Sequence, residues 1–291
     1  CAQNRADFNA TWTILANLNN LNTFTVLADI KDTITACCAQ TQADFNATWT
    51  ILAALGANCP ATPITQASFG VAGTSPYIIT NSGTYQIIED ITYNGSASTQ
   101  AIVIRSSNVT LDCCSTLRQG NANANVDGVR VDANYTDVVI QNGKIENFTG
   151  TGITLQDGVK RFKILGTTLL SNANGGVALN GTTGNRILEG MINNVDIFSG
   201  STNSGAGSPL FINFATDIKV NTVRVDQNGL LSNSLTITGI ALANSIKVDL
   251  TNVDVNDNFG MVGGVSLTSV SNSMFKNCNV RSNVNSSGGF F

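Results

Sequence analysis

Residues Gly152 to Leu155 read Gly-Ile-Thr-Leu, and this short pattern recurs through the second half of the chain. It returns as Gly-Val-Ala-Leu, Gly-Ile-Ala-Leu and Gly-Val-Ser-Leu, starting at Gly176, Gly239 and Gly264, and Gly128 starts an earlier variant, Gly-Val-Arg-Val. A drifting period of 24 to 33 residues is typical of a solenoid, in which each repeat forms one coil. We expect the first inward apolar residues of successive coils to stack as Ile102, Val129, Ile153, Val177, Leu210, Ile240, Val265 and Phe290.

Each period holds more than one strand. After the first motif come residues 161–164 and 167–170, which alternate apolar and polar side chains, the period-two pattern of a half-buried strand. Three strands at about 3.3 Å per residue, with corners, use about 24 residues, and successive coils then pair in parallel at about 4.8 Å. Asparagine tolerates the left-handed backbone of a sharp corner, so we expect it to turn the chain after the third strand, at Asn172, Asn228, Asn258 and Asn283.

With these repeats, residues 77–291 resemble the right-handed parallel β-helix superfold, the pectin-lyase-like group. The resemblance implies an all-β, right-handed parallel β-helix solenoid. It leaves function open, because this fold hosts lyases, hydrolases, phage tailspikes, adhesins and structural fibres.

The first 56 residues differ in kind, because residues 1–18 are nearly repeated as residues 38–55. The repeated apolar residues fall on one helical face, so residues 1–56 are predicted to form a duplicated amphipathic helical segment that serves as cap or assembly element. Residues 57–76 are expected to be a linker, and the last coil is unfinished at its end. The residues predicted to mediate assembly are therefore Phe8, Trp12, Leu15, Phe45, Trp49, Leu52, Phe290 and Phe291.

Composition narrows the function classes. The formal net charge is −4, which argues against a nucleic-acid partner, and no run of about 18 apolar residues predicts a membrane span. The chain has no histidine, so a Ser/His/Asp or Cys/His site cannot form. Asp127, Asp132 and Asp137 are interpreted as corner residues rather than calcium ligands. We therefore expect no catalytic residue, no metal and no cofactor, although a site made only of carboxylates stays open.

Seven cysteines and eight glycosylation sequons suggest a secreted or surface-displayed protein. Cys278 shares the inward parity of Val280 several coils from any other cysteine and is predicted to be free. The disulfide candidates are Cys1, Cys37, Cys38, Cys59, Cys113 and Cys114. The glycosylation candidates are Asn9, Asn46, Asn94, Asn108, Asn134, Asn147, Asn180 and Asn285.

Aligning the strands predicts three outward columns. The first strands give a nearly uncharged column of Arg130, Thr154, Ala178, Phe211, Ala241 and Ser266. The third strands give Lys144, Thr168, Asp196, Arg224, Asp254 and Asn279, with an ion ladder through Asp196, Arg224 and Asp254. The second strands give a basic stripe for an anionic partner, either an acidic glycan or a neighbouring subunit: Lys163, Arg186, Lys219 and Lys247.

From the sequence we predict a non-enzymatic structural subunit of an extracellular filament or particle-surface spike that assembles head to tail with copies of itself. The duplicated helices, the unfinished last coil and the missing histidine favour this interpretation. Two alternatives stay open: a carbohydrate-active β-helix enzyme, either a polysaccharide lyase or a glycoside hydrolase, and a glycan-binding adhesin. A groove holding two carboxylates about 5 to 9.5 Å apart would favour the enzyme.

Overall fold

The computed structural model describes residues 61–198, 200, 208–228, 238–256, 258 and 263–281. Residues 1–56, predicted to be helical, and Phe290 and Phe291 lie outside these ranges. These include every residue expected to mediate assembly, so those expectations stay predictions. The described residues fall in one compact unit, Ala61–Phe291. Among them, no helix has the length and apolar character needed to cross a membrane.

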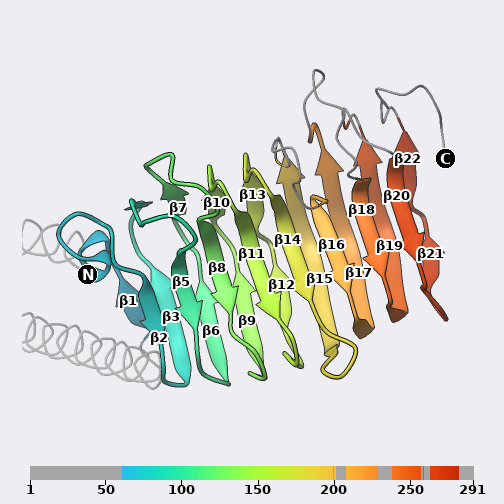
Figure 1. Cartoon of the computed structure of the whole chain (residues 1–291), viewed down its shortest axis with the longest axis horizontal. Helices are drawn as coiled ribbons and strands as arrows, with labels where there is room; N and C mark the ends of the chain where they lie inside the picture. Colours follow the sequence, from blue (N-terminus) through green and yellow to red (C-terminus); the bar gives the residue numbers. More distant parts are fainter. Residues whose placement is uncertain are drawn as a thin grey trace, which may run out of the picture. The chain divides into compact units, whose positions relative to one another are not determined.

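The described chain is an all-β parallel β-helix, as the repeats predict (Figure 1). Each coil contributes its first strand to an eight-stranded sheet, whose neighbours are all parallel. These first strands are β2 (Tyr77–Ile79), β5 (Gln100–Ile104), β8 (Asp127–Val131), β11 (Thr151–Gln156), β14 (Gly175–Asn180), β16 (Leu210–Asn213), β18 (Thr238–Ala243) and β20 (Gly263–Thr268).

The second and third strands of the coils form a 14-stranded parallel sheet. Early second strands are β3 (Gly83–Ile87), β6 (Val109–Asp112), β9 (Val138–Gln141) and β12 (Lys163–Leu165). Early third strands are β4 (Ile91–Tyr93), β7 (Thr116–Gln119), β10 (Lys144–Glu146) and β13 (Thr168–Leu170). In three later coils the two strands run on as one: β15 (Ile187–Phe198), β17 (Ala215–Asp226) and β19 (Ile246–Asn256). The last described coil has β21 (Met274–Lys276) and β22 (Asn279–Arg281).

The stacking of the first strands is confirmed residue by residue. Ile102, Val129, Ile153, Val177, Leu210, Ile240 and Val265 are successive register partners, and all but the last are fully buried. The outward column from Arg130 to Ser266 also pairs as predicted. Phe290, the last member of the inward series, lies outside the described residues.

The glycine that opens the motif is required by the close approach of successive coils. A Cβ atom on Gly128 would lie 2.5 Å from the carbonyl oxygen of Gly152, and one on Gly152 would lie 2.9 Å from that of Gly176. The same holds for Gly239 against Gly264, at 2.8 Å. Such distances leave no room for a side chain, so glycine recurs at this point of the coil.

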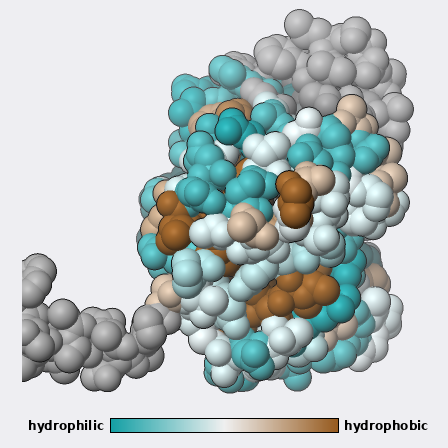
Figure 2. Space-filling view, turned by 90° about the vertical axis from the view of Figure 1, so that its left-hand side faces the viewer, coloured by the Kyte–Doolittle hydropathy of each residue, from teal (hydrophilic) through white to brown (hydrophobic). Residues whose placement is uncertain are grey.

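The segment expected to be a linker contributes structure from Thr62 onward. Strand β1 (Thr62–Ile64) pairs with β3, and the short 3₁₀ helix η1 (Gln66–Phe69) follows it. The ring of Phe69 is buried, with its centroid 6.1 Å from that of Tyr77 and 6.0 Å from that of Tyr93. Figure 2 looks onto the β1 end, where hydrophobic patches lie among hydrophilic side chains.

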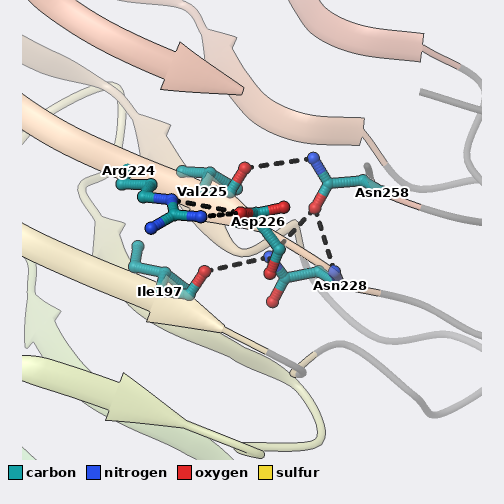
Figure 3. A network of polar contacts seen from close by, with 6 residues as sticks. All are labelled: Ile197, Arg224, Val225, Asp226, Asn228 and Asn258. Atoms are coloured by element: carbon teal, nitrogen blue, oxygen red, sulfur yellow. Dashed lines mark hydrogen bonds and ion pairs between the residues drawn. The ribbon is translucent and has the colours of Figure 1, made fainter. Parts of the chain in front are cut away.

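Asparagine amides line the interior at the end of the third strand, which corrects the expected role of Asn172, Asn228 and Asn258. These three side chains are fully buried, whereas the left-handed residue is the one before, Ser171 (φ 55°) or Gln227 (φ 53°). The Nδ2 atom of Asn228 donates to the carbonyl of Ile197 (3.1 Å) and to Oδ1 of Asn258 (3.0 Å) (Figure 3). The amides therefore link consecutive coils from within, and Asn283 lies outside the described residues.

The third-strand column has the predicted register but not the predicted ion ladder. Arg224 stands between Asp196 and Asp254 in register, yet its guanidinium bonds the buried carboxylate of Asp226 on its own strand, at 2.5 Å. It also stacks over the ring of Phe198, with 5.0 Å to the centroid. Arg224 pairs with Asp226 rather than with the exposed Asp196 or Asp254, because a buried carboxylate has lost its water and depends more on a charged partner.

Candidate functional site

A column of left-handed residues marks the corner where the second strands start, inside β15, β17 and β19 and just before the other second strands. The backbone φ is between 50° and 58° at every member of this corner column, which runs through seven successive coils. Left-handed backbone suits Asn and Asp but costs other L-residues energy. The column consists of Asn108, Asp137, Arg161, Glu189, Asp217, Lys247 and Asn272.

The central members of the corner column depart from that preference. Arg161, Glu189 and Lys247 are neither Asn, Asp nor Gly, although they hold the same backbone conformation as their neighbours. Backbone strain retained at particular positions is a pointer to function. The middle of the column is therefore the first place to look for a site.

Two ion pairs join neighbouring members of this column. Arg161 donates two hydrogen bonds to Asp137, at 2.7 and 2.6 Å, and this guanidinium lowers the pKa of the Asp137 carboxyl to about 2. The Lys247 ammonium lies 3.2 Å from Asp217. Glu189, between Arg161 and Asp217, makes no ion pair within 4 Å among the described residues.

The corner column forms one side of a surface groove. A hollow of about 620 Å³ is lined by Asp137, Arg161, Phe162, Lys163, Glu189, Gly190, Met191, Asp217 and Lys219. A second hollow of about 470 Å³ is lined by Met191, Asn193, Lys219, Val220, Asn221, Asp249, Thr251 and Met274. Both volumes are in the range of ligand sites. The lining comes from strands β12, β15, β17, β19 and β21, from Arg161 and Phe162 before β12, and from Asp137 before β9.

Two carboxylates from adjacent coils stand side by side in the first hollow. Leu188 pairs with Thr216 and Gly190 with Ile218, so Glu189 and Asp217 lie opposite each other between them. Their backbones share one conformation, with φ of 55° and 57°. Adjacent parallel strands are about 4.8 Å apart, so the two residues are one coil step apart; retaining glycosidases use two carboxyl groups about 5 to 5.5 Å apart. Such a pair needs no histidine.

Sequence reasoning did not single out Glu189 and Asp217. Instead it placed Lys163, Arg186, Lys219 and Lys247 in one basic stripe, and this stripe does not form. Lys163 and Lys219 share a column but are separated by Met191, and the next member of that column is Asp249. Lys247 lies in the corner column.

Arg186 is set apart from the groove and ties coils together. Its guanidinium donates to Thr216 Oγ1 (2.8 Å), to the carbonyl of Ala215 (2.9 Å) and to that of Asn244 (2.6 Å). The groove lining itself carries both acidic and basic side chains.

The aspartates considered as calcium ligands each have a separate partner. Asp127 accepts the backbone N–H of Thr151 at 2.8 Å, and burial raises the pKa of its carboxyl. Asp132 pairs with Arg105 and Arg130, at 2.6 and 2.7 Å. In the part of the chain that the structure describes, no three His, Cys, Asp or Glu side chains gather as metal ligands.

The disulfide candidates stay a prediction, because four of the six are not described by the structure. Among the described residues Cys113, Cys114 and Cys278 carry free thiols. Cys113 and Cys114 are neighbours just after β6 and point to opposite faces, so Cys113 is buried in the core and Cys114 is exposed. Cys1, Cys37, Cys38 and Cys59 lie outside the described residues.

The two adjacent thiols should differ sharply in reactivity. Burial raises the pKa of Cys113 to about 12, and a hydrogen bond to Asp112 Oδ1 (3.0 Å) raises that of Cys114. Since the thiolate is the nucleophile, Asp112→Asn should lower the pKa of Cys114 and speed its alkylation at pH 8. Site-resolved mass spectrometry after iodoacetamide treatment checks this, with Cys113 unmodified as the internal control. An unchanged Cys114 rate would contradict it.

The glycosylation candidates within the described residues are all at least partly accessible. Asn108, Asn134 and Asn147 are exposed, and Asn94 and Asn180 are half-buried. Asn9, Asn46 and Asn285 lie outside the described residues. Use of these sequons stays a prediction.

Comparisons with known proteins give only remote matches. No protein-family model and no curated protein matches the chain. Among solved structures, it matches the enzymatically active domain of tailspike protein 2 of bacteriophage CBA120, with 12% identity and a TM-score of 0.38. It also matches tailspike protein gp49 of the Acinetobacter baumannii bacteriophage Fri1, a capsular polysaccharide depolymerase, with 12% identity and a TM-score of 0.37. The matches cover 75% and 77% of this chain but 38% and 49% of those chains.

The expectation that the chain is not an enzyme needs correction. Both tailspike structures that the chain matches are described by an enzymatic role, contrary to that expectation, and this role is said of those proteins. The missing histidine was the main ground for that expectation, and the Glu189–Asp217 pair removes it, since a carboxylate pair is sufficient for glycoside hydrolysis.

Proposed function

We propose that this β-helix binds a polysaccharide in the groove over β12, β15, β17 and β19 and hydrolyses it with Glu189 and Asp217. The main support for this proposal is that two carboxylates on adjacent coils lie in a groove whose volume is in the range of ligand sites. The protein would act outside the cell or at a particle surface, where such polymers are met. A spike-like subunit that also associates with copies of itself fits this role.

The two carboxylates suit different roles in such a reaction. Asp217, whose carboxylate lies 3.2 Å from the Lys247 ammonium, would serve as the nucleophile that attacks the anomeric carbon. Glu189 would serve as the proton donor to the oxygen of the leaving sugar. In the second step the same group would activate water, which releases the sugar from Asp217 with retained configuration.

The proposal is tested by a cleavage screen on purified full-length chain. The panel holds polygalacturonate, alginate, xylan, dextran and bacterial capsular polysaccharides, and new reducing ends are measured. For any polymer that is cleaved, Glu189→Gln and Asp217→Asn should each lower the rate by about 10² to 10⁴-fold, the contribution of a positioned acid or nucleophile. Asp196→Asn, on the outward face of the third strand, is the matched control and should cleave normally. Equal rates in all three variants would refute the assignment.

A further inference from the structure

Two arginines from adjacent coils share one carboxylate on the sheet of first strands. Arg105 directly follows β5, Arg130 lies in β8, and Asp132 directly follows β8. The Nε atom of Arg105 donates to Asp132 Oδ2 at 2.6 Å, and that of Arg130 donates to Asp132 Oδ1 at 2.7 Å. One carboxylate therefore holds both guanidiniums, and we call Arg105 and Arg130 the arginine pair.

The arginine pair carries more positive charge than its carboxylate balances. Two cations face one anion here, whereas the other ion pairs within 4 Å among the described residues hold equal numbers of cations and anions. The balanced groups are Arg161 with Asp137, Arg224 with Asp226, Lys247 with Asp217, and Arg118 and Lys144 with Asp90 and Glu146. The carboxylate of Asp127 also acts on Arg130, but from beyond ion-pair distance. The pair is thus a locally positive site on a chain whose formal net charge is −4.

The Nη groups of the arginine pair find no acceptor within the part of the chain that the structure describes. Both arginines bond through Nε alone. Arg186 and Arg224, by contrast, also donate through Nη. The Arg130 side chain is only 25% exposed, and its register neighbours Val103 and Thr154 are buried. N–H groups that are partly removed from water cost free energy when they make no hydrogen bond, so the Nη groups favour an acceptor at this place.

A tetrahedral oxyanion matches these donors better than a carboxylate does. A guanidinium is a planar fork that bonds two oxygens at once, and a carboxylate has only two oxygens, which one fork occupies. A sulfate or phosphate group carries at least three accepting oxygens, so one such group can accept from both arginines. Lysine would supply the charge without the fork.

We propose that the arginine pair binds a sulfate or phosphate group, either as the free ion or as an ester on a larger molecule. Asp132 is the positioning residue, because it holds the two guanidiniums together through Nε and leaves their Nη groups to the ligand. The pair lies on the sheet of first strands, whereas the groove lies over the second strands, so this proposal does not depend on the proposed function. Neither arginine belongs to the basic stripe that the sequence predicted.

Isothermal titration calorimetry of the full chain with sodium sulfate tests the proposal, with chloride holding the ionic strength constant so that screening does not change. A single sulfate should bind. Arg130→Lys keeps the charge but removes the fork, so the affinity should fall about tenfold, and Arg105→Lys should act in the same direction. Arg118→Lys is the matched control, because Arg118 lies in a balanced group, and it should bind sulfate as the wild type does. Circular dichroism checks that each variant is folded.

Competition with dextran sulfate separates the two sources of the ligand group. If the ligand is an ester on a polymer, dextran sulfate should displace sulfate from the wild type, and unmodified dextran should not. If the ligand is the free ion, dextran sulfate should leave sulfate binding unchanged. Both results support an oxyanion site as long as Arg130→Lys weakens sulfate binding. A wild type that binds no sulfate, or an equal loss in Arg130→Lys and Arg118→Lys, would overturn the proposal.

Discussion

Replacing Asn228 with alanine should lower the free energy of unfolding by about 3 kcal/mol, because the change leaves several buried polar groups without partners. The amide of Asn228 accepts the N–H of Gly200 at 2.8 Å and donates to the carbonyls of Ile197 and Asp226 at 3.1 and 2.9 Å. Its Nδ2 atom also donates to Oδ1 of Asn258 in the next coil. The side chain is fully buried, so bulk water does not reach the groups that lose their partner.

Urea unfolding followed by circular dichroism measures this loss. Asn221→Ala is the matched control, because Asn221 also links two coils by its amide but lies half-buried on the outer face. Water can satisfy the groups exposed there, so the control should lose less than about 1 kcal/mol. If both variants lost the same amount, the inner amides would not be what holds the coils in place.

The stacked columns were predictable because apolar and polar residues alternate along each first and third strand. The series from Ile102 to Val265 and the column from Lys144 to Asn279 have the predicted register. Inward parity alone fixes which residues face the core, and the recurring glycine fixes where each coil starts. The fold class follows from these two signals.

The basic stripe could not be predicted correctly, because an alternating pattern looks the same when one strand is shifted by two residues against its neighbour. Ile218-Lys219-Val220 and Ile246-Lys247-Val248 look equivalent in sequence, yet Lys219 pairs with Asp249. A slip of two keeps every side chain on its own face, so hydrophobicity gives no warning. Lys247 instead lies opposite Asp217 in the corner column.

The candidate site was missed for a related reason. Glu189 and Asp217 are 28 residues apart in a chain with few obvious motifs, and only the register of β15 and β17 brings them together. The available signal was that Arg161, Glu189 and Lys247 occupy a corner where the other coils use Asn or Asp. That signal becomes visible only once the corner column is known.

Glu189→Asn should raise stability and abolish cleavage together. Asparagine adopts the left-handed backbone (φ 55°) more readily than glutamate, so the free energy of unfolding should rise by a few tenths to about 1 kcal/mol. For a domain of this size that is a gain of about 1 to 4 °C in Tm. The shorter amide cannot donate the proton that the reaction needs, so the cleavage rate should fall by about 10² to 10⁴-fold.

Thr222→Asn separates the two effects. Thr222 holds the same left-handed conformation (φ 52°) at the next corner, but it is exposed and does not line the groove. This control should gain stability and cleave as the wild type does. A glutamate kept at a strained corner against stability is the pattern expected of a residue retained for function.

The most direct measurement is therefore the paired assay of Tm and cleavage rate on wild type, Glu189→Asn and Thr222→Asn. The account predicts a higher Tm in both variants, with cleavage lost only in Glu189→Asn. Cleavage at the wild-type rate by Glu189→Asn would contradict the claim that the Glu189–Asp217 groove is the active site.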